Sequence, residues 1–211
     1  MDGAVDARRI TIHAPEDFAG MRAAGRLAAE TLDMIGPHVK PGVSTGALDK
    51  LCHDNIVDHG AVPAPLNYRG YPKSICTSIN HVVCHGIPSE RKLESGDILN
   101  IDVTVILNGW HGDSSRMYVA GTPSTKARNL MEVTYESLMR GVSMVRPGAT
   151  LGDIGHAIQV YVESQRFSVV RTSAATASAG ASTNRRTCCI SAASARGRCY
   201  GRGCSSRSSR W

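Results

Sequence analysis

Two aspartates, Asp102 and Asp113, are the side chains whose spacing most clearly suggests shared chemistry. They lie in the segment ILNIDVTVILNGWHGDSSRMYVAG, where an alternating apolar pattern meets Asn108-Gly109, a dipeptide typical of a two-residue type I′ turn. With that turn, Thr104 pairs with Asp113, and alternation of side chains puts both carboxylates on one face, as diagonal neighbours about 7 to 8 Å apart. Two carboxylates held on rigid strands can bridge to shared divalent cations.

The same positions have simpler interpretations. Acidic residues on a hairpin are often only its solvated face. His85, in VVCHGIP, is either a further ligand or a loop residue that hydrogen-bonds locally. His111, near Asp113, either hydrogen-bonds a metal ligand without binding the metal itself or lies at the surface. The loop LNYRGYPKS either contacts RNA through its aromatic and basic residues or lines a pocket, and its Gly and Pro favour the pocket.

The surrounding elements are readable from periodicity. Helical spacing of apolar residues recurs in residues 15–35, 44–60, 123–145 and 150–165. Thr150, followed by Asp153, predicts a capping box at the start of the last helix. Segments 74–80 and 81–87 carry β-branched residues in the manner of strands. This mixture predicts an α/β or α+β domain.

The composition of the chain changes at Arg171. Eight of the 24 basic residues are arginines from Arg171 onward, whereas all 18 acidic residues precede it. No Leu, Val, Phe or Met occurs from Thr172 to Trp211, so this stretch cannot bury enough apolar area to offset its ordering entropy. The sequence predicts a folded domain over residues 1–171 and a disordered basic tail over residues 172–211.

The cellular setting follows from what the sequence contains. The formal net charge of +6 is the sum of +8 from the eight arginines of the tail and −2 from the 16 basic and 18 acidic residues of the body, so it does not mark the body as a nucleic-acid binder. The N-terminal stretch MDGAVDARRITIHAPEDF carries acidic residues and has no apolar core typical of a secretory leader. No run approaches the roughly 18 apolar residues that a membrane span needs. We therefore expect a soluble cytoplasmic protein that makes no membrane contact.

Three segments carry a resemblance to a known family. PAPLNYRGYPKSICTSINHVVCHGIP, GDILNIDVTVILNGWHGDSSRMYVAG and VKPGVST resemble type I methionine aminopeptidases, and the similarity runs from about Ile10 to Arg171. The resemblance implies an α+β pita-bread fold, of which this chain carries the N-terminal half. It also implies hydrolytic removal of the initiator methionine by a water bridged between two divalent metal ions. Cobalt, manganese, iron, zinc and nickel are all open as the metal.

The resemblance also implies roles for individual residues. Asp102 resembles a ligand of one metal, Asp113 the carboxylate that bridges both, and His85 the imidazole that contacts the substrate. Cys76 and the loop containing Tyr68 resemble the lining of the methionine pocket, which suits a thioether side chain. The implied partners are the N-terminal methionine of nascent polypeptides and the ribosome, with no specific nucleic acid, and the family is usually monomeric.

The later part of the family's site has no counterpart in this sequence. The family has a His in a Gly-His-Gly turn, a second His in a Phe-His motif and two later Glu ligands. Here the last histidine, His156, falls on a predicted helix, and the last acidic residue is Glu163. We therefore expect the chain as written to be inactive.

Codons offer an explanation for the tail. The family would continue with a sequence such as Asp-Phe-Cys-Gly-His-Gly-Leu-Gly-Arg. A GC-rich coding of that peptide, read after removal of its first nucleotide, gives Thr-Ser-Ala-Ala-Thr-Ala-Ser-Ala-Gly, which is residues 172–180. The tail is thus predicted to be an out-of-frame translation.

Three alternatives compete with these predictions. The tail could be a natural basic extension that binds RNA or ribosomes through phosphate contacts. The body could be a pita-bread relative that has lost catalysis and serves as a binding protein. A pita-bread peptidase for X-Pro substrates is disfavoured by the loop NYRGYPKSICTSIN.

Overall fold

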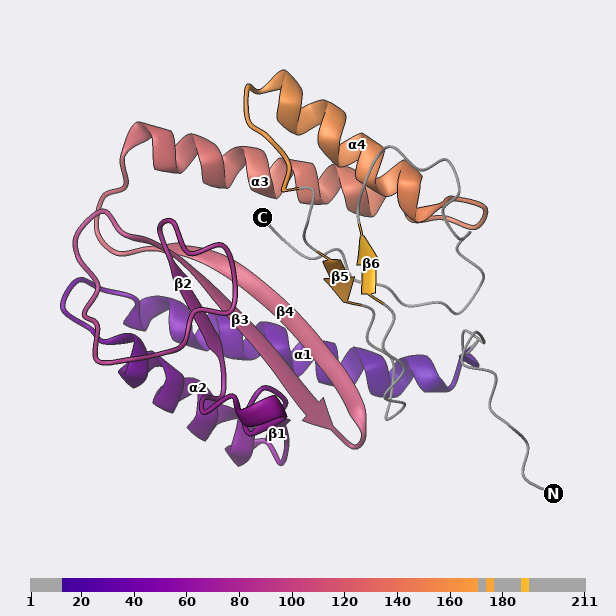
Figure 1. Ribbon diagram of the computed structural model, residues 1–211. Coiled ribbons are helices and arrows are strands. Elements are labelled where there is room, and N and C mark those ends of the chain that lie inside the picture. Colours follow the sequence, from indigo (N-terminus) through magenta and orange to yellow (C-terminus); the bar gives the residue numbers. More distant parts are fainter. Residues whose placement is uncertain (1–12, 171–173, 177–186, 190–211) are drawn as a thin grey trace. The chain divides into compact units, whose positions relative to one another are not determined.

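The computed structural model describes residues 13–170, together with the backbone of residues 174–176 and 187–189 (Figure 1). The chain divides into two compact units, one formed by residues 19–131 and the other by the segments on either side of it. Across the described part of the chain, no helix is both long enough and apolar enough to cross a membrane.

The unit of residues 19–131 is a four-stranded antiparallel sheet with two helices. Its elements are α1 (Asp17–Ile35), α2 (Thr45–Asp58), β1 (Val62–Pro63), β2 (Cys76–Ile79), β3 (Ile98–Leu107) and β4 (Trp110–Val119), with short 3-10 helices at Gly36–His38 and Tyr68–Gly70. β3 pairs with β4 along one edge and with β2 and β1 in succession along the other. Strand β3 is therefore the central element on which the rest of the unit is assembled.

Helices α1 and α2 cover one face of this sheet (Figure 1). The buried apolar residues of α1 recur at helical spacing: Ala24, Leu27, Ala28, Leu32 and Ile35. The Thr31 hydroxyl lies within hydrogen-bonding distance of both Leu27 O and Asn55 Oδ1, which ties α1 to α2. Ser44 caps α2 by accepting a hydrogen bond from the backbone N–H of Ala47. One continuous apolar core thus lies between these two helices and the sheet.

The second unit takes in the later part of α3 (Thr125–Ser143) and α4 (Leu151–Ser164). Its apolar core is small: within the described residues, three side chains of α4 are buried in it, namely Ile154, Ile158 and Val162. Ile158 packs against Gly141, where an added Cβ would lie 2.9 Å from the Ile158 side chain. The predicted capping box of α4 is present, because Thr150 and Asp153 each accept the other's backbone N–H.

Beyond residue 170, strands β5 (Ala174–Thr176) and β6 (Thr187–Cys189) pair antiparallel. The other residues there lie outside the described part, so the disordered tail of residues 172–211 stays a prediction for them. The four predicted helices and the hairpin are all present. Segment 81–87 differs from its strand-like sequence, because it forms an irregular stretch without strand pairing of its own.

Candidate functional site

The β3–β4 hairpin has the predicted register and so places both candidate metal ligands. Thr104 pairs with Asp113, which makes Asp102 the diagonal neighbour of Asp113. The turn residues Asn108 and Gly109 have φ angles of 50° and 82°, the left-handed values that a type I′ turn requires. Because a slip of one residue would move both carboxylates to the opposite face, the turn determines on which face they lie.

Strand β3 divides apolar from polar side chains. Its four fully buried residues face α1 and α2: Leu99, Ile101, Val103 and Val105. Asp102 and Asp113 are half-buried on the opposite face. On that same face the Asn100 side-chain amide donates to the Ser115 hydroxyl at 3.3 Å. The acid pair thus belongs to a polar surface that the main core does not occupy.

Cys76 lies directly beside Asp102, because β2 pairs with β3 at these two residues. Burial raises the pKa of the Cys76 thiol, and the negative charge of Asp102 raises it further, while a hydrogen bond with Tyr71 acts in the opposite direction. A protonated thiol is a small, soft, apolar group. The Cys76 thiol is therefore an apolar neighbour of Asp102.

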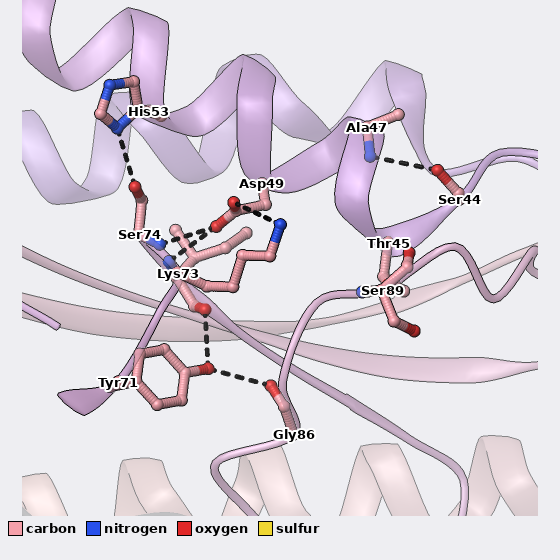
Figure 2. A network of polar contacts seen from close by, with 11 residues as sticks. Ser44, Thr45, Ala47, Asp49, His53, Tyr71, Lys73, Ser74, Gly86 and Ser89 are labelled. Atoms are coloured by element: carbon pink, nitrogen blue, oxygen red, sulfur yellow. Dashed lines mark hydrogen bonds and ion pairs between the residues drawn. The ribbon is translucent and has the colours of Figure 1, made fainter. Parts of the chain in front are cut away.

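A buried carboxylate of α2, Asp49, fixes the chain just before β2 (Figure 2). Its Oδ1 accepts the backbone N–H groups of Ser74 at 2.8 Å and Ile75 at 3.1 Å. The Lys73 ammonium lies 3.9 Å from the Oδ2 atom of Asp49. Asp49 itself is only 7% exposed. His53, one turn further along α2, hydrogen-bonds the Ser74 hydroxyl at 2.8 Å. These contacts anchor the start of the strand that carries Cys76 to the helix layer.

Asp49 was not predicted from the sequence to have a role, although its position in α2 could have indicated one. It lies among the buried positions of α2, one residue after Leu48 and three before Cys52, on a stripe that is otherwise mostly apolar. A charged residue on the buried face of an amphipathic helix is seldom there without partners. That its partners would be Ser74 and Ile75, however, depends on tertiary packing.

His85 lies on the other side of β2 from Asp102. The neighbouring Gly86 O accepts the Thr77 N–H at 2.8 Å, so this segment runs along the free edge of β2. Two strand spacings separate it from β3, about 10 Å between backbones. His85 itself is exposed, with a left-handed φ of 55°. The structure therefore brings Asp102 and Asp113 together on one hairpin and places His85 on a separate segment nearby.

His111 lies on the same face as Asp113. It pairs with Ile106 across the hairpin, two residues before Asp113. Its Nδ1 atom is buried and has no hydrogen-bond partner within the described part of the chain. Buried polar atoms normally have a partner, so the acidic face offers an imidazole nitrogen as well as carboxylate oxygens to a polar group.

The residues present fit a divalent metal only in part. Asp102 and Asp113 supply the hard oxygen ligands that such ions prefer, and the buried Nδ1 of His111 adds to the polar character of the face. Within residues 13–170, no three His, Cys, Asp or Glu side chains are grouped so as to hold a metal ion. The roles of His85, Asp102 and Asp113 therefore stay predictions.

The profile of metallopeptidase family M24 matches residues 19–189, and the chain belongs to that family. Within it, the chain is similar to proteins named methionine aminopeptidase. It is 63% identical over 162 residues to the one from Rickettsia prowazekii and 58% identical over 164 residues to the one from Escherichia coli strain K12. Each alignment covers 77% of this chain and 62% of the relative.

The structural comparison agrees with this assignment. The crystal structure of methionine aminopeptidase from Rickettsia prowazekii superimposes with a TM-score of 0.89 and 53% identity, covering 93% of this chain and 79% of that one. The expected α+β pita-bread fold is confirmed. The sequence similarity nevertheless spans only about 62% of the length of the curated relatives.

Proposed function

We propose that this chain represents part of a metal-dependent methionine aminopeptidase, a hydrolase that removes the initiator methionine from nascent polypeptides in the cytoplasm. The observation that carries the proposal is the diagonal placement of Asp102 and Asp113 on the polar face of the β3–β4 hairpin. The identity of 63% to a relative of that name supports it. The ribosome is the expected neighbour of such an enzyme, which we take to be monomeric.

Each candidate residue has a distinct role in this proposal. Asp102 and Asp113 would hold two divalent ions, with Asp113 as the ligand shared by both. Carboxylate oxygens suit manganese, iron or cobalt as well as zinc or nickel. Metal ions bound there would supply a water acidic enough to act as a nucleophile near neutral pH. His85 contacts the substrate close to the scissile amide. Protonated Cys76 offers an apolar surface to the methionine side chain.

We further propose that these 211 residues alone do not turn over substrate. Two carboxylates without further ligands bind a metal weakly and leave its water unfixed. No acidic residue follows Glu163 and no histidine follows His156 in the sequence. On this proposal residues 172–211 are an out-of-frame translation, which the coding DNA tests. A coding region with no displaced frame downstream of Arg171 would overturn it.

Metal binding is the direct test of the acid pair. We expect calorimetric titration with Mn²⁺ or Co²⁺ to detect weak binding by this chain, and Asp102→Asn and Asp113→Asn each to abolish it. Asp54→Asn is the matched control, because Asp54 is a half-exposed carboxylate of α2 that pairs with Lys50. Binding that survives both hairpin substitutions would refute the proposed ligands.

Methionine release from a Met-Gly peptide tests the activity. The 211-residue chain and a version with the reading frame restored after Arg171 are assayed side by side with added Co²⁺, Mn²⁺ or Fe²⁺. We expect release only by the restored version. Turnover by this chain that is lost in Asp113→Ala would show that its site is complete. A restored version that binds metal yet releases no methionine would favour a non-catalytic binding protein.

A further inference from the structure

The hydroxyl of Tyr71 connects two segments that lead to different parts of the candidate site (Figure 2). It lies 3.0 Å from the carbonyl oxygen of Ile75, which directly precedes Cys76 and β2. It also lies 3.2 Å from the carbonyl oxygen of Gly86, the residue after His85. The single O–H of this phenol is therefore shared between the strand beside Asp102 and the segment that carries His85.

Both acceptors belong to well-anchored backbone. The N–H of Ile75 donates to the buried Asp49 carboxylate, so the backbone of this residue is held at its N–H by α2 and at its carbonyl by Tyr71. Gly86 also accepts the Thr77 N–H, and its own N–H donates to the Ser78 hydroxyl at 3.2 Å. A Cβ at position 86 would lie 2.0 Å from Thr77 O, so only glycine allows this close approach.

His85 needs such support from its neighbours. Its φ of 55° lies in the left-handed region, which residues other than glycine seldom adopt. The side chain is exposed, so core packing does not hold it, and its place depends on how firmly Gly86 is bound. Burial holds the pKa of Tyr71 above its usual value, with further contributions from Cys76 and nearby carboxylates. The phenol therefore keeps its proton, and remains a donor, near neutral pH.

We propose that Tyr71 is a positioning residue that fixes the His85 segment relative to β2 and the Cys76–Asp102 pair. The catalytic meaning of this contact rests on the proposed role of His85, but the contact itself can be tested without activity. When the hydroxyl is removed, the carbonyl oxygen of Gly86 keeps the Thr77 N–H as a donor, and the carbonyl of Ile75 loses its phenol donor. The His85 segment should then open more readily while the sheet stays intact.

Tyr71→Phe tests this with the smallest possible change, since the ring is retained. We expect amide hydrogen exchange across residues 84–87 to accelerate about fivefold, as the loss of one hydrogen bond implies, and the His85 ring resonances to shift. Tyr118→Phe is the matched control, because its hydroxyl also donates to a backbone carbonyl, Leu32 O, on the opposite face of the sheet. Tyr68→Phe, in the same loop but 62% exposed, controls for local sequence change.

The outcomes are separable. Faster exchange and shifted His85 resonances in Tyr71→Phe alone would support the positioning role. Unchanged behaviour of residues 84–87 in Tyr71→Phe would overturn it, as would equal changes in Tyr118→Phe, which would indicate a general loss of stability. Metal binding through Asp102 and Asp113 is measured separately, so failure of the proposed function and failure of the positioning role give different results.

Discussion

The two faces of the β3–β4 hairpin consist of alternate residues of the same strands, yet different interactions hold them in place. The inner face is close-packed against helices, and the backbone of Gly112 touches that of Ala24 on α1. The outer face presents Asp102 and Asp113, and its Asn100 and Ser115 side chains hydrogen-bond to each other. Stability is thus concentrated on one face and the candidate chemistry on the other. Substitutions one residue apart should therefore separate folding from metal binding.

The largest effect is expected from Ile101→Ala compared with Asp102→Ala. Ile101 is fully buried, so its truncation should lower the free energy of unfolding by about 2 to 5 kcal/mol. Asp102 is half-buried on the polar face, and its truncation should cost less than about 1 kcal/mol while abolishing metal binding. Urea denaturation and metal titration of both variants check this. Equal losses of stability would contradict the separation of the two faces.

The contact between α1 and β4 should be nearly as sensitive. A Cβ at position 112 would lie 2.0 Å from the backbone oxygen of Ala24, so Gly112→Ala must push α1 off the sheet, at a cost of about 3 kcal/mol. The control is Gly25→Ala in α1, where an added Cβ meets nothing within 4 Å and should stabilise the helix by about 0.5 to 1 kcal/mol.

Urea unfolding midpoints of the two glycine variants give the comparison. Opposite signs are expected from the same chemical change at neighbouring positions in space. A Gly112→Ala protein as stable as the parent would show that α1 is not closely seated on β4, and the inner face would then owe its stability to α2 and the strands alone.

Local patterns were sufficient to predict the hairpin. Asn108-Gly109 determines the turn, and strict alternation along β3 determines which face carries Asp102, so register and face both follow from short-range rules. The helices followed from periodicity in the same way. Segment 81–87 was misleading, because its β-branched residues suggest a strand, whereas Gly86 binds the edge of β2 in an irregular conformation.

The support of the site could not be predicted in that way. Asp49 contacts residues 25 and 26 positions later in the chain, and Tyr71 contacts Gly86 15 positions later. Such pairs are set by how α2, the loop before β2 and the His85 segment pack in three dimensions. From the sequence alone, only the position of the acidic Asp49 among the buried residues of α2 indicated that such contacts exist.

Alkaline pH should lower the free energy of unfolding through Cys52, which is fully buried between α2 and the sheet. Burial, assisted by the charge of Asp49, raises its pKa to about 12 from an ordinary value of 9.0. The thiol ionises at a lower pH in the unfolded chain than in the folded one. Its burial therefore contributes fully to the free energy of unfolding below pH 9, and this contribution is lost as the pH rises toward 12. At pH 10 the expected loss is about 1.4 kcal/mol.

Cys52→Ala removes this titration, so its stability should decline less steeply above pH 9 than that of the parent. Cys84→Ala serves as the control, because Cys84 is exposed. Urea midpoints measured at a series of alkaline pH values distinguish the two. Parallel curves for Cys52→Ala and the parent would show that the thiol is accessible to solvent and that the inner side is less tightly closed than the packing indicates.

The smallest effect is expected at the solvent edge of the inner face, where Arg116 of β4 pairs with Asp33 of α1. Their side chains are 46% and 69% exposed, so solvent and salt screen the pair and its coupling energy should stay below about 0.5 kcal/mol. A double-mutant cycle with Arg116→Ala and Asp33→Ala, measured at low and high salt, gives the value. A coupling energy above about 1 kcal/mol would mean that a polar contact, and not apolar packing alone, holds α1 against the hairpin. The contrast between an apolar inner face and a polar outer face would then no longer hold at this edge.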